Sequence, residues 1–211
     1  MKVLIFGGTG LVGTAVTRRA VAAGHEVTVF TRNKQHVTID GVTVVEGSVK
    51  NAEQVAQAVK GMDAVIQCIG IGGRGNGKPT TVASDANRVI TQVMEQEGVK
   101  RYIAMSVVGA GDSWTALPWI YHRCLLSWFQ SWFVPIIDDK NRMEQDIVKT
   151  GLDWTVVRGT TVKDKSARGH YKAITDGRYL SFSITATDLA DFIVAQLNSH
   201  DYVRKMPVVC N

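Results

Sequence analysis

Three glycines near the start of the chain are the first residues whose type and spacing could do chemistry. Gly7, Gly10 and Gly13 form a GxxGxxG pattern that directly follows the apolar run 2–6. Glycines between a buried strand and a helix let the backbone approach a pyrophosphate closely, and the amide groups at the start of the helix then bind the phosphate oxygens. The pattern therefore predicts a dinucleotide site. The alternative is a glycine-rich turn with a purely structural role.

The residues after the second apolar run, 27–31, indicate which dinucleotide would bind. NAD sites commonly place an Asp or Glu here to bind the ribose hydroxyls, but the segment 30–34 contains no carboxylate. An arginine can instead bind a 2′-phosphate through paired hydrogen bonds. We therefore expect Arg32, assisted by Lys34, to favour NADP(H) over NAD(H). The alternative is that Arg32 is only a solvated cation.

The chain lacks the tyrosine–lysine pair with which many short-chain dehydrogenases transfer a proton. Its five tyrosines are followed, four residues later, by Ser, Leu, Thr, Ser and Met, never by Lys. Reduction of a flavin or a quinone does not require that pair, because the acceptor's own electronics drive hydride uptake and water can supply the proton. An enzyme of this kind works by orienting the acceptor over the nicotinamide.

Ser106 is the strongest polar candidate for contact with a cofactor or an acceptor. It lies at the carboxyl end of the predicted strand 101–105, where ligands of a parallel sheet bind. The alternative is a strand-end hydroxyl that caps the backbone. We expect no metal site, because no two histidines have metal-ligand spacing and no CxxC pair occurs. Hydrolase chemistry has no support either, since the GxSxG motif is absent.

The elements that must position these residues alternate between strand and helix, which is typical of an α/β fold. We predict a Rossmann-type, doubly wound parallel sheet with helices on both faces and a small C-terminal substrate region, in the strand order 3-2-1-4-5-6. The expected strands span residues 2–6, 27–31, 42–45, 64–69, 101–105 and 154–157, with an edge strand at 208–209. The expected helices begin near Val12, after the cap Asn51, near Val82, before Met143 and after the cap Thr187. The helix that begins near Val82 is expected to stop at Gly98.

The composition is that of one globular domain, residues 1–211, with 45% apolar and 20% charged residues. The net charge of +5 suits a small anionic ligand, but there is no basic tail of the kind that binds nucleic acid. We expect no nucleic-acid partner. The sequence contains no stretch of about 20 apolar residues, so we expect no membrane span. Its three cysteines are widely spaced, which suits a reducing, cytoplasmic location.

With these motifs in place, the chain resembles the atypical short-chain dehydrogenase/reductase family. The similarity is to the NmrA-like, NAD(P)H-binding proteins related to flavin reductase/biliverdin reductase B. It covers essentially the whole chain, and the motifs that carry it lie at 7–13, 27–33, 63–70, 138–144, 150–158, 169–171, 176–178 and 184–189.

The resemblance implies a set of cofactor contacts. The pyrophosphate loop and the residues around the 2′-phosphate and the adenine would be Gly7, Thr9, Gly10, Leu11, Val12, Thr31, Arg32, Ser48 and Val49. The ribose and the nicotinamide would be bordered by Ile69, Gly70, Ser106 and Val107. The family usually has an Asp where this chain has Ser48, and the flavin reductase has a His where this chain has Thr161.

Lys140 is the second candidate catalytic residue, after Ser106. In many relatives a Lys near this position approaches the nicotinamide ribose, whereas the flavin reductase carries a His. The alternative is a solvated cation at the start of a helix.

Three segments could shape an acceptor site. Residues 112–134 hold four of the five tryptophans and form a candidate lid over a planar acceptor, with core packing or a dimer interface as the alternatives. The glycine-rich segment 70–78 could fold over the nucleotide or simply be a loop. Residues 159–186 would form the substrate side.

Together these features predict an NADPH-dependent oxidoreductase that transfers hydride to a planar acceptor such as a flavin, a quinone or a bilin. The alternative is a non-catalytic protein of the NmrA type that senses NAD(P). The expected oligomeric state is a monomer or a weak homodimer.

Overall fold

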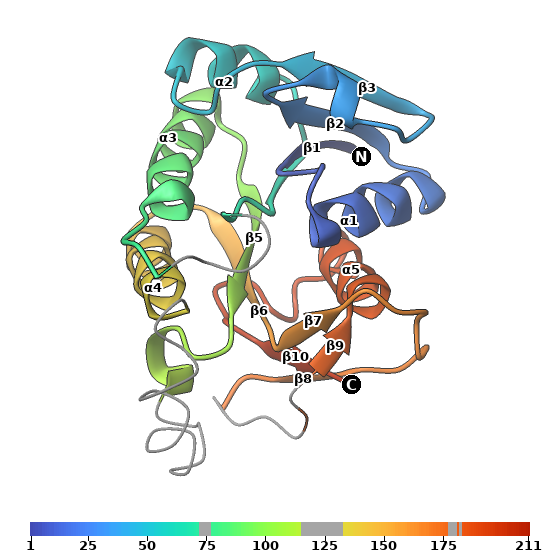
Figure 1. Ribbon diagram of the computed structural model, residues 1–211. Coiled ribbons are helices and arrows are strands. Elements are labelled where there is room, and N and C mark those ends of the chain that lie inside the picture. Colours follow the sequence, from blue (N-terminus) through green and yellow to red (C-terminus); the bar gives the residue numbers. More distant parts are fainter. Residues whose placement is uncertain (72–76, 115–132, 177–180, 182) are drawn as a thin grey trace.

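The computed structural model describes residues 1–71, 77–114, 133–176, 181 and 183–211. The strands of the main sheet are β1 (Lys2–Phe6), β2 (Glu26–Thr31), β3 (Val42–Glu46), β4 (Ala64–Gln67), β5 (Arg101–Val107), β6 (Asp153–Gly159), β8 (Lys172–Ile174) and β10 (Val208–Cys210). The helices are α1 (Leu11–Ala22), α2 (Ala52–Val59), α3 (Val82–Glu97), α4 (Val134–Val148) and α5 (Ala186–Ala195) (Figure 1). Within these described residues, the short 3-10 helices η1 (Lys34–His36) and η2 (Gly111–Trp114) follow β2 and β5.

The strand order of the sheet is β3-β2-β1-β4-β5-β6-β10-β8. Its first six strands are parallel and have the predicted order, which confirms the doubly wound fold. The segment 208–209 was wrongly expected at the edge, because β10 lies between β6, to which it is parallel, and β8, to which it is antiparallel. The three residues of β8 are too few for a periodic signal in the sequence. A separate pair consists of β7 (Thr161–Lys163) and β9 (Ser183–Thr185).

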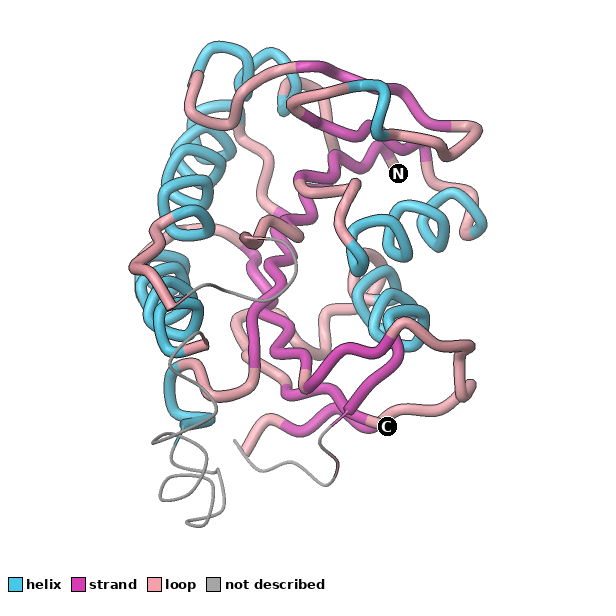
Figure 2. Tube along the Cα trace, viewed as in Figure 1, coloured by secondary structure: helices cyan, strands magenta, loops and turns pink. Residues whose placement is uncertain are grey.

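The sheet buries both of its faces, as a parallel sheet with crossover helices requires. Along β1, Val3 and Ile5 pack on the face covered by α1 and α5, whereas Leu4 and Phe6 pack on the face covered by α2, α3 and α4. Figure 2 shows the two groups of helices on opposite sides of the strands. This arrangement leaves the carboxyl ends of β1, β4 and β5 side by side, with the glycine loop after β1 at that edge.

Two predicted helix boundaries can be compared with the structure. The predicted stop at Gly98 is confirmed, because this glycine ends α3 with φ +73°. The predicted cap Thr187 is wrong: the side chain of Thr185 accepts a hydrogen bond from the Asp188 amide and begins α5 two residues earlier. Both threonines precede the large apolar residues of the helix, so the sequence does not distinguish them. The extended backbone of Thr185 (φ −78°, ψ 151°) identifies it as the cap. Within the described part of the chain, no helix is long and apolar enough to cross a membrane.

Candidate functional site

The glycine loop after β1 is closely packed, and two of its glycines cannot be replaced without a clash. Gly7 has φ +77°, and a Cβ atom there would lie 2.7 Å from the carbonyl carbon of Cys68. A Cβ atom on Gly13 would overlap the carbonyl group of Gly7. These contacts join the loop to α1 on one side and to the chain after β4 on the other, as a dinucleotide loop requires.

The start of α1 is suited to an anion. Its first helical hydrogen bond runs from the Thr14 amide to the Gly10 carbonyl oxygen, so the amides of Leu11, Val12 and Gly13 precede the hydrogen-bonded turns. Gly10 caps the helix without a side chain, and the first turn holds no acidic residue. The positive end of the helix dipole thus faces the glycine loop without a carboxylate of its own, and the loop fits a pyrophosphate.

The residues predicted to bind the 2′-phosphate lie at the carboxyl end of β2. Arg32 is exposed and directly follows the strand. The Thr31 hydroxyl oxygen accepts a hydrogen bond from the Asn33 amide at 3.3 Å, and the Asn33 side chain begins η1 by accepting one from the Gln35 amide. The turn therefore has a defined shape, and it presents a cation where NAD sites present an acid.

The predicted adenine residues follow β3. The amide of Ser48 donates to Gln54 Oε1 at 2.9 Å, and the Ser48 hydroxyl oxygen accepts from the Lys50 amide at 3.3 Å. Val49 is half-buried and packs against the core beneath α2 and α3. The Gly47 amide donates to the carbonyl oxygen of Thr31, which places this segment beside the end of β2.

Lys140 lies at the same edge of the sheet and is not the solvated cation of the alternative prediction. Its side chain is buried, with the residue only 5% exposed, and Nζ donates to the carbonyl oxygens of Ile69, at 3.0 Å, and of Met105, at 2.8 Å. Burial lowers the pKa of Lys140 to about 8, although the acidic groups of Asp139, Cys68 and Glu144 act in the opposite direction. A buried cation thus lies at the carboxyl ends of β4 and β5.

Ser106 is fully buried, and its hydroxyl group donates to Glu144 Oε1 at 2.6 Å. Glu144 lies on α4 and also accepts from the guanidinium of Arg158, Nε at 3.1 Å and Nη2 at 2.8 Å. The expected contact of Ser106 with a cofactor stays a prediction. Neighbouring Val107 ends β5 half-buried, and Gly70 is exposed after β4.

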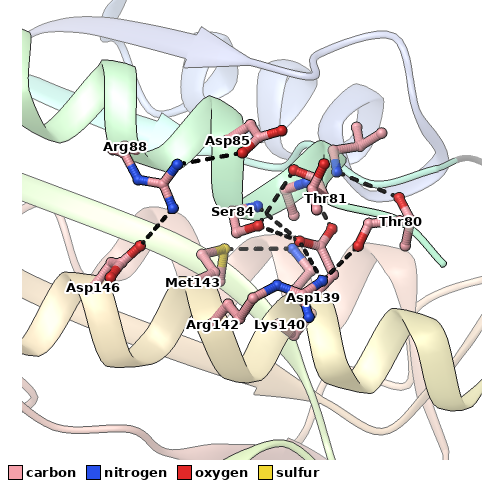
Figure 3. A network of polar contacts seen from close by, with 12 residues as sticks. Thr80, Thr81, Ser84, Asp85, Arg88, Asp139, Lys140, Arg142, Met143 and Asp146 are labelled. Carbon is pink, nitrogen blue, oxygen red and sulfur yellow. Dashed lines mark hydrogen bonds and ion pairs between the residues drawn. The ribbon is translucent and has the colours of Figure 1, made fainter.

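Asp139 joins the helices α3 and α4 (Figure 3). This side chain is 2% exposed and accepts hydrogen bonds from the amides of Ala83, at 2.8 Å, and Ser84, at 3.1 Å. The Ser84 hydroxyl group also donates to it. The nominal cap Thr81 makes no side-chain hydrogen bond to the helix, so α3 is capped by a residue 56 positions away in the sequence.

The structure therefore brings the predicted pyrophosphate loop, Ile69 and Lys140 together. The Cys68 amide donates to the Phe6 carbonyl oxygen, Gly7 abuts the Cys68 backbone, and the next carbonyl group, that of Ile69, accepts from Lys140. The sequence predicted no role for Asp139, Glu144 or Arg158. The signals that could have found them are the motifs at 138–144 and 150–158, which contain all three residues.

Some predicted features lie outside the described residues. These are positions 115–132 of the aromatic segment 112–134, positions 72–76 of the segment 70–78, and 177–180 and 182 of the segment 159–186. Within the described ranges, no three His, Cys, Asp or Glu side chains gather as metal ligands would.

Comparisons with known proteins identify the family to which this chain belongs. The family model for NAD(P)H-binding proteins matches residues 7–200. The photosystem II assembly factor Ycf39 of Synechocystis is 25% identical over 161 residues, which cover 75% of this chain but 44% of Ycf39. The chain thus spans less than half the length of that relative.

Solved structures share the fold. ChuY, an anaerobilin reductase from Escherichia coli O157:H7, has a TM-score of 0.83 and 22% identity, with 100% of this chain and 97% of that chain covered. A short-chain dehydrogenase/reductase from Veillonella parvula in complex with NADP has a TM-score of 0.78 and 16% identity, with 100% and 94% covered. The chain belongs to the NAD(P)H-binding family and has the Rossmann-like fold of its reductases.

Proposed function

We propose that this chain is an NADPH-dependent oxidoreductase that transfers hydride to a planar acceptor such as a flavin, a quinone or a bilin. The observation that carries the proposal is the buried ammonium group of Lys140, which binds the carbonyl oxygens of Ile69 and Met105. This cation lies one residue from the backbone that the glycine loop abuts, beside the place where the reacting end of a dinucleotide belongs.

In this proposal, different residues bind the cofactor and act on the acceptor. Gly7, Gly10 and the amides at the start of α1 bind the pyrophosphate, and Arg32 binds the 2′-phosphate. When bound, a reduced nicotinamide supplies the hydride. Lys140 places a positive charge where negative charge develops on the acceptor and can donate a proton, since its pKa of about 8 lies close to neutral pH.

A planar acceptor needs only to be oriented over the nicotinamide, which agrees with the absence of a Tyr followed four residues later by Lys. ChuY, which shares the fold, is described as an anaerobilin reductase, and this supports keeping bilins among the acceptors to be tested. Ser106 is proposed to act in the same site, either by contact with the cofactor or through Glu144.

The test is NADPH oxidation by the purified protein with FMN, FAD, riboflavin, biliverdin and small quinones, each against a blank without enzyme. We expect turnover above the blank with at least one acceptor. Lys140→Met should lower kcat by about 100-fold or more, the contribution typical of a positioned acid. The matched control is Lys149→Met, because the Lys149 side chain is 75% exposed and pairs with Asp146 at 3.6 Å, away from the candidate site. Equal rates for the two variants would contradict the role of Lys140.

A second candidate function is a non-catalytic, NAD(P)-sensing regulator. It is favoured by the missing tyrosine–lysine pair and by the relative Ycf39, which is named as an assembly factor rather than as an enzyme. Tight binding of NADPH in a titration, with no turnover of any acceptor in the panel, would favour this function over the first.

A further inference from the structure

Glu144 lies one helical turn after Lys140, and both side chains belong to the buried face of α4. Glu144 is 3% exposed, yet its carboxylate accepts three hydrogen bonds, one from the Ser106 hydroxyl group and two from the Arg158 guanidinium. A buried carboxylate with this many partners is held in one position, because loss of any partner would leave a polar group unpaired.

Lys140 and Glu144 of α4 bind consecutive residues of β5. Lys140 Nζ donates to the carbonyl oxygen of Met105 at 2.8 Å, and Glu144 Oε1 accepts from the hydroxyl group of Ser106 at 2.6 Å. The helix is thus attached to the end of β5 by a cation and an anion one turn apart. A displacement of Glu144 from Ser106 would move the ammonium of Lys140 relative to the strand.

Arg158 completes the attachment from the next strand. It lies opposite Ser106 in the register of β5 and β6, and its side chain is 2% exposed. Its Nη1 atom donates to Asp112 Oδ1 of η2 at 2.5 Å. Gly111 packs so tightly here that a Cβ atom on it would lie 2.9 Å from Glu144 Oε2. A side chain at position 111 would therefore clash with the buried pair of Glu144 and Arg158.

We propose that Glu144 is a positioning residue for Lys140: it holds α4 against the ends of β5 and β6, so that the ammonium group stays between the carbonyl oxygens of Ile69 and Met105. The inference rests on the catalytic role proposed above for Lys140. Its first tests need no turnover, so that a failure of the proposed function and a failure of this inference can be told apart.

The charge of Glu144 adds a measurable consequence. Three acidic groups raise the pKa of Lys140 against the effect of burial: Asp139 and Glu144 from α4 itself, and Cys68 from the end of β4. Glu144→Gln keeps the shape of the side chain and removes one of these charges. The midpoint of Lys140 deprotonation should therefore fall below that of the wild-type protein.

The first experiment follows the Lys140 side chain by NMR in the cofactor-free protein, with its signals assigned from Lys140→Met. In Glu144→Gln we expect a lower titration midpoint and, well below that midpoint, at least about tenfold faster hydrogen exchange of the ammonium group, because it is no longer held. The control is Arg101→Met. It removes another buried charge, one that donates to the Gln196 and Asp153 carbonyl oxygens at the amino end of β5, and it should leave both Lys140 readouts unchanged.

If Glu144→Gln fails to fold, the double variant Glu144→Gln/Arg158→Met removes both charges of the buried pair, a replacement that proteins often tolerate. Its Lys140 ammonium should also exchange faster. Wild-type exchange in a folded variant that lacks Glu144 would overturn the inference.

The second experiment measures kinetics with the best acceptor. Glu144→Gln should lower kcat by about 10- to 100-fold with little change in the KM for NADPH, because the misplaced group acts after binding. A loss no larger than that of Arg101→Met would show a merely structural role and would overturn the inference.

Discussion

At the scale of single residues, the proposed chemistry depends on where two cations lie. Lys140 is buried between carbonyl oxygens, and Arg32 is exposed after β2. Both are basic residues in polar stretches of the sequence, but their surroundings give them different tasks. The buried amine has a lowered pKa and can exchange a proton near neutral pH, whereas the exposed guanidinium group of Arg32 is suited to binding an anion.

Arg32→Ala tests the cofactor preference. The variant should bind NADPH roughly 10- to 100-fold more weakly, which corresponds to the loss of hydrogen bonds to a charged phosphate. Binding of NADH should stay within about twofold, because NADH lacks the 2′-phosphate. Titration of both nucleotides by fluorescence measures the two constants. The control is Arg18→Ala, which removes an exposed arginine from α1. An equal loss for both nucleotides would count against a 2′-phosphate site.

At the scale of elements, α3 and α4 depend on each other. The start of α3 has no side-chain cap of its own, and Asp139 of α4 supplies the missing acceptor together with a negative charge at the positive end of the helix dipole (Figure 3). The same residue precedes Lys140 in the sequence. The helix that carries the candidate catalytic residue is therefore held by its neighbour on one side and by β5 on the other.

Asp139→Ala should lower the free energy of unfolding by about 1–3 kcal/mol, because two helix amides and the Ser84 hydroxyl group lose their acceptor. Urea denaturation followed by circular dichroism measures the change. Asp138→Ala is the matched control, since it removes an exposed carboxylate from the adjacent position of the same helix. If both variants lose the same stability, the cap contributes nothing specific.

At the scale of the whole molecule, the last fifty residues close the sheet beyond β6. Asp188 is fully buried and accepts hydrogen bonds from the amides of Arg168, at 2.8 Å, and Gly169, at 3.0 Å, from the Thr185 hydroxyl group and from the Asn211 side chain. One carboxylate thus joins α5, the segment before β8 and the residue after β10.

The pKa of Asp188 lies below its ordinary value of 3.8. Burial by itself would raise it, but the hydrogen bonds from Thr185, Arg168, Gly169 and Asn211 outweigh burial. Because the folded state holds the charged form, this stabilisation is fully present above pH 4 and is lost as the pH falls through the lowered pKa.

Asp188→Asn should therefore lower the free energy of unfolding by about 1–3 kcal/mol at pH 7, and the difference from the wild-type protein should shrink below pH 4. Denaturation at a series of pH values from 7 to 3 checks both parts. Asp164→Asn, at an exposed acid between β7 and β8, is the control and should show neither effect. A difference that grows on acidification would reverse the assigned direction of the pKa shift.

Much of the fold could be predicted from the sequence, because the signals are local and strong. Buried apolar runs such as residues 3–6 of β1, glycines with a positive φ such as Gly98, and caps such as Asn51 each act within a few residues. The strand that covers β10 and the cap of α5 could not be predicted in the same way. The strand β8 has only three residues, and two threonines, Thr185 and Thr187, both precede the large apolar residues of α5. The cofactor residues followed a motif, and their contacts with a nucleotide stay predictions.

The sequence by itself determined the alternation of strands and helices, the order of the first six strands, and a glycine loop between the first strand and the first helix. Those properties follow from hydrophobic periodicity and backbone sterics, which act between near neighbours. Only the tertiary structure decided that Lys140 is buried, that Asp139 caps a helix 56 residues away, and that Ser106, Glu144 and Arg158 form one network. These contacts join residues far apart in the chain, and burial and hydrogen bonding at such separations exist only once the sheet has brought its carboxyl ends together.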